Sequence, residues 1–202
     1  MPTSGSRACI AAWSAEADVG ALLSIDTLLA DRRLWRGQPG ALPASTEPTG
    51  HAALDAALPT CGWPEAALTE VLLTADGMGE LRLLLPTLAR HSQAGGDIAL
   101  LAPPYVPNPR AWIAAGVDFR HVQVIQANDK HALWATEQCA RAGCFAAVLC
   151  WPRQADDKAL RRLQVAAESG RTLVFAFRDK GAADNASPAA LRLKIGADHV
   201  QV

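Results

Sequence analysis

The amino-acid sequence predicts an α/β domain with a mostly parallel β-sheet that helices cover on both faces. From residue 69 onward, short and fully apolar segments alternate with longer segments of helical periodicity. An apolar run without alternation is typical of a strand buried on both faces, as in a parallel sheet. The series begins with a strand, a glycine-containing turn and a leucine-rich helix. We expect the rest of the domain to be organised around this first unit.

The composition fits one substantial domain and gives no indication of a nucleic-acid coat or a membrane anchor. The chain has 202 residues, of which 50% are hydrophobic, and its formal net charge at pH 7 is −1. A charge this close to neutral does not predict a polybasic surface. No run approaches the roughly 18 uncharged apolar residues of a membrane span, and the first twenty residues contain Arg7, Glu16 and Asp18. We therefore expect a cytoplasmic protein with no membrane partner.

The five cysteines and five histidines do not predict a metal site. No two cysteines form a C-x-x-C motif, and no histidine stands at metal-ligand spacing from a cysteine. Because most of the cysteines lie in apolar segments, we expect buried, reduced thiols. The cysteines are Cys9, Cys61, Cys139, Cys144 and Cys150.

Residues 1–18 are predicted to form a flexible N-terminus, and residues 19–48 a helix followed by a linker. Leucines at helical spacing follow Val19, and Gly37 ends the helix. Prolines at positions 39, 43 and 48 keep the next segment extended. A helix on such a linker can bind another protein or fold back on its own domain, and the pattern leaves both alternatives open.

Residues 49–202 are predicted to form the α/β domain. A short helix over residues 49–58 and a turn over residues 59–64 come first. A strand over residues 69–74 leads into a helix that begins near Gly79 and ends near His91.

Strands and helices then alternate to the end of the chain. The further strands expected are residues 97–102, 122–125, 145–150 and 173–177. The further helices expected are residues 108–116, 129–141 and 156–169. Residues 181–188 are expected to form a loop, and residues 191–195 a terminal hairpin with residues 199–202.

The turn after the first strand has the layout of a phosphate-binding P-loop without its chemistry. When the motif G-x-x-x-x-G-K-[ST] is set on residues 74–81, Gly79 alone matches, with Gly77 as a second glycine of the turn. Thr74 replaces the first glycine, Glu80 the lysine and Leu81 the hydroxyl that would hold magnesium. A carboxylate repels the phosphates that a lysine attracts. The sequence therefore predicts a degenerate P-loop that binds no nucleotide cofactor and collapses into a compact turn.

Other catalytic constellations are weak. His51 with Asp55, and Asp129 with His131, have the spacing of capping residues or of a solvated helix face. The chain has no G-x-S-x-G motif, and Cys150 at the end of an apolar strand predicts packing. We therefore expect no catalytic residue.

Short motifs along the chain follow an order found in one superfamily. Thr49-Gly50, Leu54-Asp55, Gly62-Trp63-Pro64, Leu68-Thr69-Glu70-Val71 and Pro109–Asp118 resemble the RecA recombinase core. A more specific set consists of Leu34-Trp35-Arg36-Gly37, Gly62-Trp63-Pro64, Gly79–Pro86, Ala102-Pro103-Pro104, Cys150-Trp151-Pro152 and Ser187–Arg192. Together these resemble the ImuA family, the RecA-like and SulA-related accessory proteins of bacterial mutagenic translesion synthesis. The resemblance spans residues 28–193.

This resemblance implies a RecA-like core that has lost its ATPase chemistry. The lysine of the P-loop corresponds to Glu80, the activating glutamate falls near Pro104, and the magnesium-holding aspartate falls at Trp151. ATP hydrolysis needs a phosphate clamp, a metal ion and a positioned water. We expect Trp63 and Trp151 to pack in the core or to fill the space of the missing nucleotide.

The function implied is that of a non-catalytic accessory protein of SOS-induced translesion synthesis after DNA damage. Its implied partners are RecA, an inactive Y-family polymerase-like subunit and an error-prone replicative-type polymerase, with association at the nucleoid when DNA is damaged. One alternative is a SulA-like inhibitor that binds the tubulin-like division protein. The other is a residual nucleotide-dependent DNA-binding ATPase.

Partner binding is predicted at the N-terminal helix and on one later helix. The helix at residues 19–35 is expected to dock on RecA or on a second copy of the chain. The basic face of the later helix is either solvated or a patch for DNA backbone or an acidic partner. The candidates are Leu28, Leu29, Arg32, Arg33, Trp35, Arg36, Arg161 and Arg162.

Overall fold

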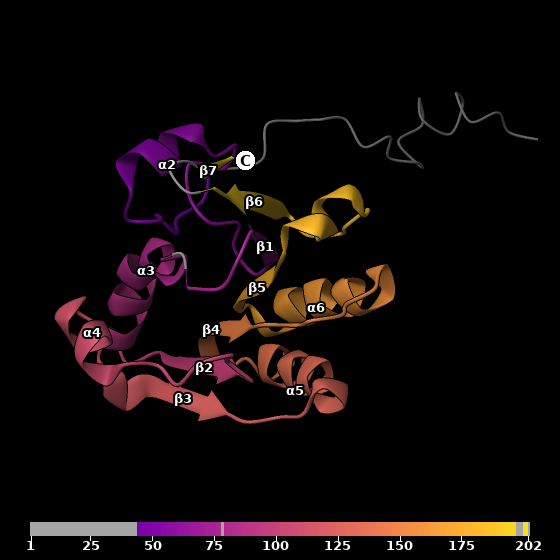
Figure 1. The fold of residues 1–202 in the computed structure, drawn as a ribbon. Helices are drawn as coiled ribbons and strands as arrows, with labels where there is room; N and C mark the ends of the chain where they lie inside the picture. Colours follow the sequence, from indigo (N-terminus) through magenta and orange to yellow (C-terminus); the bar gives the residue numbers. More distant parts are fainter. Residues whose placement is uncertain (1–43, 78, 197–199, 202) are drawn as a thin grey trace, which may run out of the picture. The chain divides into compact units, whose positions relative to one another are not determined.

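The computed structural model describes residues 44–77, 79–196 and 200–201, which form an α/β domain around a seven-stranded sheet (Figure 1). The strand order is β3-β2-β4-β5-β1-β6-β7. All neighbouring strands pair in parallel except β7, which is antiparallel to β6. The predicted mostly parallel sheet flanked by helices is therefore confirmed.

The elements follow the predicted sequence of strands and helices closely. The strands are β1 (Leu68–Leu73), β2 (Asp97–Leu101), β3 (Val122–Ile125), β4 (Phe145–Cys150), β5 (Leu173–Asp179), β6 (Leu191–Ile195) and β7 (Val200–Gln201). The α-helices are α2 (Ala52–Ala57), α3 (Leu81–Gln93), α4 (Pro109–Ala114), α5 (Asp129–Ala142) and α6 (Asp157–Gly170). Two 3₁₀ helices, η1 (Phe119–His121) and η2 (Lys180–Asp184), complete the described part.

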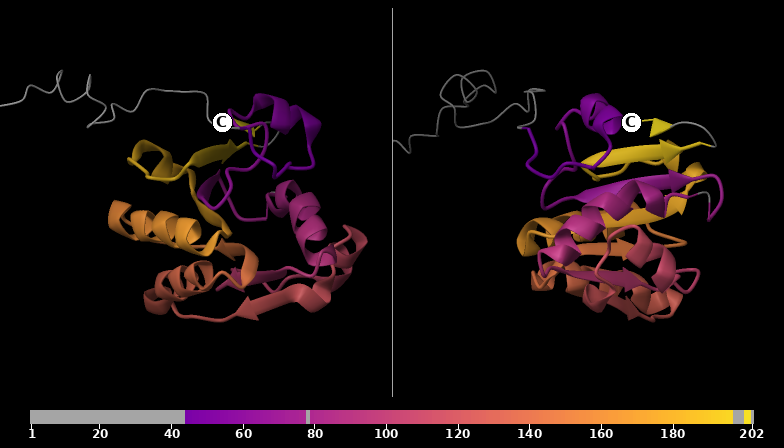
Figure 2. Two further views of the ribbon diagram at one scale, coloured as in Figure 1. Left: turned by 180° about the vertical axis from the view of Figure 1, so that it is seen from behind. Right: turned by 90° about the vertical axis from the view of Figure 1, so that its left-hand side faces the viewer.

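Helices cover both faces of the sheet, as the uninterrupted apolar strands require (Figures 1 and 2). On one face, α2, α3 and α4 contribute Leu54, Leu88 and Trp112 to a buried cluster. On the other, α5 and α6 contribute Ala140 and Leu163 to a second cluster. Every residue of β1 is buried, because this strand lies between β5 and β6 and under both layers.

Polar side chains define the helix starts that the sequence predicts. The side chains of Asn108, Asn128 and Asp156 accept hydrogen bonds from backbone N–H groups in the first turns of α4, α5 and α6. After α5, Gly143 takes a left-handed conformation with φ 66°, which ends the helix without the steric cost of a Cβ.

The connections that follow the neighbouring strands β2 and β4 lead toward opposite ends of the sheet. β2 leads through α4 outward to the edge strand β3, whereas β4 leads through α6 toward β5. Such a reversal opens a crevice where the strands end, and ligands of open α/β sheets bind there. We call the side of the sheet where β1 to β5 end the carboxyl edge.

Part of the expected linker is held on the domain. The carboxylate of Glu47 lies 2.6 Å from Arg90 and 3.0 Å from His91, both on α3. The backbone carbonyl of Glu47 also accepts a hydrogen bond of 2.8 Å from the N–H of Trp63. The predicted N-terminal helix, by contrast, lies outside the described residues.

The cysteines are less buried than their apolar segments predict. Cys150 is buried and Cys139 partly so, but Cys61 and Cys144 are exposed. Cys61 stands in the turn after α2, and Cys144 lies between the end of α5 and the start of β4. Cys9 is outside the described residues. Within the described part, no helix has the length and apolarity to span a membrane.

Candidate functional site

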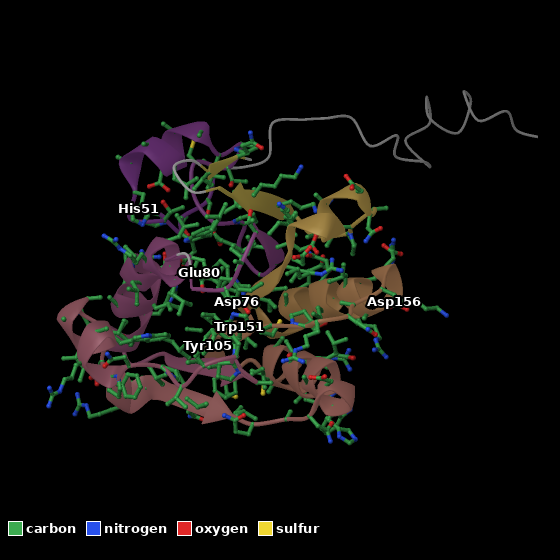
Figure 3. The ribbon with its side chains drawn as sticks, in the orientation of Figure 1. His51, Asp76, Glu80, Tyr105, Trp151 and Asp156 are labelled. Carbon is green, nitrogen blue, oxygen red and sulfur yellow. The ribbon has the colours of Figure 1, made fainter. Side chains whose placement is uncertain are left out.

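A cavity of about 920 Å³ lies at the carboxyl edge, in the crevice expected from the reversal between β2 and β4. Its walls come from the segments after β1, β2, β3 and β4 and from the end of β5. Asp76, Pro103, Asp129, Trp151 and Arg178 represent these five segments. Figure 3 labels Asp76 and Trp151. We call this hollow the carboxyl-edge cavity.

The turn predicted to be a degenerate P-loop is exposed and lies beside this cavity. Gly77 and Gly79 have φ values of 79° and 88°, which a residue with a Cβ adopts only with strain. Thr74 to Gly77 and Gly79 are exposed, whereas Glu80 is only 7% exposed at the N-terminal end of α3. A negative charge is favourable at a helix N-terminus, which gives Glu80 a structural role where a P-loop has its lysine. Neither glycine, nor Glu80, is among the residues that line the cavity.

The two tryptophans expected near the nucleotide position have different places. Trp151 is half-buried, lines the cavity and stacks on Phe177 with ring centroids 4.8 Å apart and planes at 13°. Trp63 is fully buried in the core. There its indole Nε1 donates a hydrogen bond of 2.8 Å to Thr87 Oγ1, and its ring meets Phe175 edge-on at 5.1 Å. Of these two tryptophans, Trp151 alone lies at the carboxyl edge beside the cavity.

A buried ion cluster, which the sequence did not predict, is connected to the cavity through Arg178. Glu70, in the middle of β1, is fully buried and pairs with Arg178 at the end of β5. Its other carboxylate oxygen lies 2.9 Å from Nε of Arg192 on β6, an ion pair without the alignment of a hydrogen bond. The sequence signal for this cluster is a single charged residue, Glu70, inside a strand that is otherwise uncharged.

The two arginines of this cluster also hold the segments around the cavity. Arg178 donates a hydrogen bond of 2.8 Å to the carbonyl of Ala155, in the segment that joins β4 to α6. Arg192 donates to the carbonyls of Ala182, Ala183 and Asn185, at 2.7 to 3.2 Å, in and after η2. Glu70 thus fixes two connections through its partners.

The charges that line the carboxyl-edge cavity are mainly negative. Asp76 and Asp129 are exposed, and no hydrogen bond or ion pair joins either side chain to another described residue. Asp179 also lines the cavity and accepts a hydrogen bond of 2.7 Å from the N–H of Gly181. Arg153 supplies one exposed positive charge, and Arg178 shares the negative charge of Glu70 with Arg192. Phosphates would meet repulsion at such a site.

The basic residues predicted on α6 are paired with carboxylates. Arg161 lies 3.8 Å from Asp157, and Arg162 lies 3.6 Å from Glu137 on α5. Exposed pairs of this kind contribute little to stability, but they reduce the local positive charge. The six other predicted partner-binding residues, Leu28, Leu29, Arg32, Arg33, Trp35 and Arg36, lie outside the described part of the chain.

Asp55 and Cys150 are two further candidates, and the structure gives each a structural environment. The carboxylate of Asp55 accepts a hydrogen bond of 2.9 Å from the backbone N–H of Thr49. Burial raises the pKa of the Cys150 thiol to about 12, against the opposing influence of Thr136 and Arg178, so this thiol is a poor nucleophile. Among the described residues, no group of three or more histidine, cysteine or acidic side chains could hold a metal ion.

One known protein family matches a region of this chain that contains most residues of the carboxyl-edge cavity. The family described as cell division inhibitor SulA matches residues 66–174, more than half of the chain. This chain belongs to the SulA family. The matched residues run from the start of β1 to the start of β5 and include Asp76, Asp129 and Trp151.

A curated relative agrees with this assignment. The cell division inhibitor SulA of Pectobacterium atrosepticum is 30% identical over 122 residues, which are 59% of this chain and 72% of that protein. The crystal structure of SulA from Pseudomonas aeruginosa is 26% identical, with a TM-score of 0.47 over 57% of this chain and 98% of that one.

Two predictions are corrected by this family assignment. The predicted function in translesion synthesis is wrong, because the family and the curated relative are both described as cell division inhibitors. The predicted partners RecA, the inactive Y-family polymerase-like subunit and the error-prone replicative-type polymerase are wrong for the same reason. The coarser resemblance to SulA is confirmed. A family of inhibitors is also compatible with a protein that has no catalytic activity.

Proposed function

We propose that this protein is an SOS-induced inhibitor of cell division that acts by binding the tubulin-like division protein FtsZ. The observation that carries the proposal is the match of residues 66–174 to the SulA family. This match covers four strands that are consecutive in the chain, β1 to β4, and the helices between them. It is therefore longer than an isolated motif.

The chemistry of the carboxyl edge supports inhibition by binding. Glu80 and the exposed aspartates disfavour the phosphates that an ATPase would hold. The same edge presents Tyr105 and Val106, which are 68% and 87% exposed. Large exposed apolar side chains are typical of surfaces that bind other proteins. We place the action of the protein in the cytoplasm, where its proposed partner assembles.

A sedimentation assay tests the proposal. Purified division protein is polymerised with GTP in the presence of increasing amounts of this protein, and the pelleted fraction is measured. We expect the pellet to fall as the two proteins approach equimolar amounts, since a binder that sequesters subunits acts stoichiometrically. Heat-unfolded protein is the control. An unchanged pellet at a twofold excess of native protein would overturn the proposed function.

Finer points of ancestry are also proposals. We propose that the domain descends from a RecA-like core whose P-loop has degenerated, on the basis of Gly79 and its flanking strand and helix. A titration with ATP and magnesium checks the loss of function, and micromolar affinity would contradict it. The similarity to the ImuA branch remains a proposal about sequence relationship alone.

The N-terminal segment remains a proposed binding element. Residues 19–35 are proposed to bind a second copy of the chain or the division protein. Deletion of residues 1–40, followed by measurement of the solution mass and of inhibition, tests this. Unchanged values for both would contradict it.

A further inference from the structure

The loop after β2 presents two apolar side chains on a stiff support at the carboxyl edge. Tyr105 and Val106 stand between Pro104 and Pro107, and Pro103 and Pro104 line the carboxyl-edge cavity. Ala102, at the base of the loop, has a φ of 47°, a conformation that non-glycine residues adopt only when their surroundings impose it. A loop that is already ordered loses little entropy when it binds. This makes Tyr105 and Val106 suitable anchors for a protein partner.

The cavity beside this loop has the charge of a site for a cation. Asp76 and Asp129 approach it from the segments after β1 and β3, and neither carboxylate is joined to another described side chain. Asp179 adds a third negative charge. The positive charges of the lining are Arg153, which is exposed, and Arg178, which shares the single negative charge of Glu70 with Arg192. The three aspartates and two arginines of the lining therefore carry a formal net charge of about −1.

An aromatic surface lies in the same cavity. Trp151 is half-buried, and its ring is held by stacking at 4.8 Å on the buried Phe177. An ordered indole face attracts a guanidinium or ammonium group within about 6 Å of the ring. Acidic groups around an indole favour a basic side chain over an uncharged one of the same shape.

We propose that the carboxyl edge is the surface that docks the protein partner, and that its cavity receives a basic side chain, arginine or lysine, of that partner. Tyr105 and Val106 pack against apolar residues that flank this basic side chain. The proposal rests on the function proposed above, since it names how the division protein would be recognised. The charge of the cavity also distinguishes this occupant from a nucleotide or a free phosphate.

The first experiment uses a small probe and does not depend on the partner. Nα-acetyl-arginine amide is titrated into the full chain, and the indole N–H resonance of Trp151 is followed by NMR. Nα-acetyl-citrulline amide, which has nearly the same shape and no charge, is the matched ligand control. We expect a saturable shift with the arginine probe, at least fivefold weaker binding of the citrulline probe, and no shift with inorganic phosphate.

Paired variants locate the effect. Asp76→Asn with Asp129→Asn removes two carboxylates from the cavity, and we expect at least a fivefold loss of affinity for the arginine probe. Asp184→Asn with Glu168→Gln removes two exposed carboxylates away from the cavity lining, and we expect affinity to change less than twofold. Equal binding of both probes, equal loss in both double variants, or binding of phosphate in place of arginine would each overturn the inference.

The second experiment uses the sedimentation assay with the division protein. Asp76→Asn with Asp129→Asn, and separately Tyr105→Ser, should raise the concentration for half-inhibition at least fivefold. Circular dichroism confirms folding, and Tyr105→Ser carries the test if the double variant does not fold. If wild-type protein inhibits and these variants inhibit equally well, the docking surface is wrong and the proposed function stands. If wild-type protein does not inhibit, the proposed function fails, and the arginine probe still decides the occupant of the cavity.

Discussion

Replacement of Glu70 by glutamine tests the structural importance of the buried ion cluster. Glutamine keeps the shape of the side chain but removes its charge, so two guanidinium groups lose their common counter-charge. The side chain of Glu70 is 0% exposed, that of Arg178 is 8% exposed and that of Arg192 is 27% exposed. Arg178 therefore has little access to compensating water, whereas Arg192 can be partly hydrated.

The expected loss of stability follows from this difference in exposure. Breaking a buried pair by removing one partner costs about 3–5 kcal/mol. Because Arg192 can recover some hydration, we expect the lower end, about 3 kcal/mol of unfolding free energy. In a protein of this size, that corresponds to a decrease in Tm of about 6–12 °C.

Urea denaturation followed by circular dichroism measures this change directly. Glu168→Gln is the matched control, since Glu168 is exposed on α6 and its replacement should change the unfolding free energy by less than about 0.5 kcal/mol. A loss below about 1 kcal/mol for Glu70→Gln would show that Arg178 and Arg192 are not left as costly unpaired charges. That result would refute the importance of the buried ion cluster for stability.

Three further predictions concern single side chains. Trp63→Ala should lower the unfolding free energy by about 3–5 kcal/mol in the same urea assay, because it leaves a cavity in the core; a loss below about 1 kcal/mol would contradict this placement. At pH 8, the exposed Cys144 should react with a thiol reagent, whereas Cys150 should stay unmodified until the protein unfolds, because burial raises the pKa of Cys150 to about 12. The labelled positions are mapped by mass spectrometry, and a label on Cys150 in the native protein would disprove this prediction. The hydrogen bonds of Arg120 lower the pKa of Asp118 to about 2, so their contribution to stability is present above about 3.8 and is lost as the pH falls through about 2. Arg120→Ala should raise that pKa part of the way toward 3.8 in a carboxylate NMR titration, and an unchanged value would argue against the side chain as the main cause.

Element boundaries could be predicted because local chemistry determines them. The strand at Phe145–Cys150 is apolar throughout, and Asn128 and Gly143 cap the helix before it at its two ends. Strand order could not be predicted, because adjacent parallel strands such as β1 and β6 are far apart in the sequence. The buried ion cluster of Glu70 depends on the strand order, and therefore it could not be predicted either.

The misassigned function has a physical explanation in the motifs that led to it. Trp63 is fully buried, and a Cβ at Gly62 would lie 2.5 Å from the carbonyl oxygen of Glu47. Leu84 and Trp112, from two further motifs, are also in the core. Residues of this kind are maintained by packing and report the fold that related proteins share. The side chains that select a partner lie on the surface, where single-sequence motifs carry little information.

The ion cluster also sets a minimum length for any shortened form of this protein. The family match ends at residue 174, but both cations that face Glu70 come later, at Arg178 and Arg192. A fragment trimmed to the matched region would retain the anion in its central strand without either counter-charge, and would also expose the edge of β1 that β6 covers. Truncation studies should therefore keep the chain through Ile195, the end of β6.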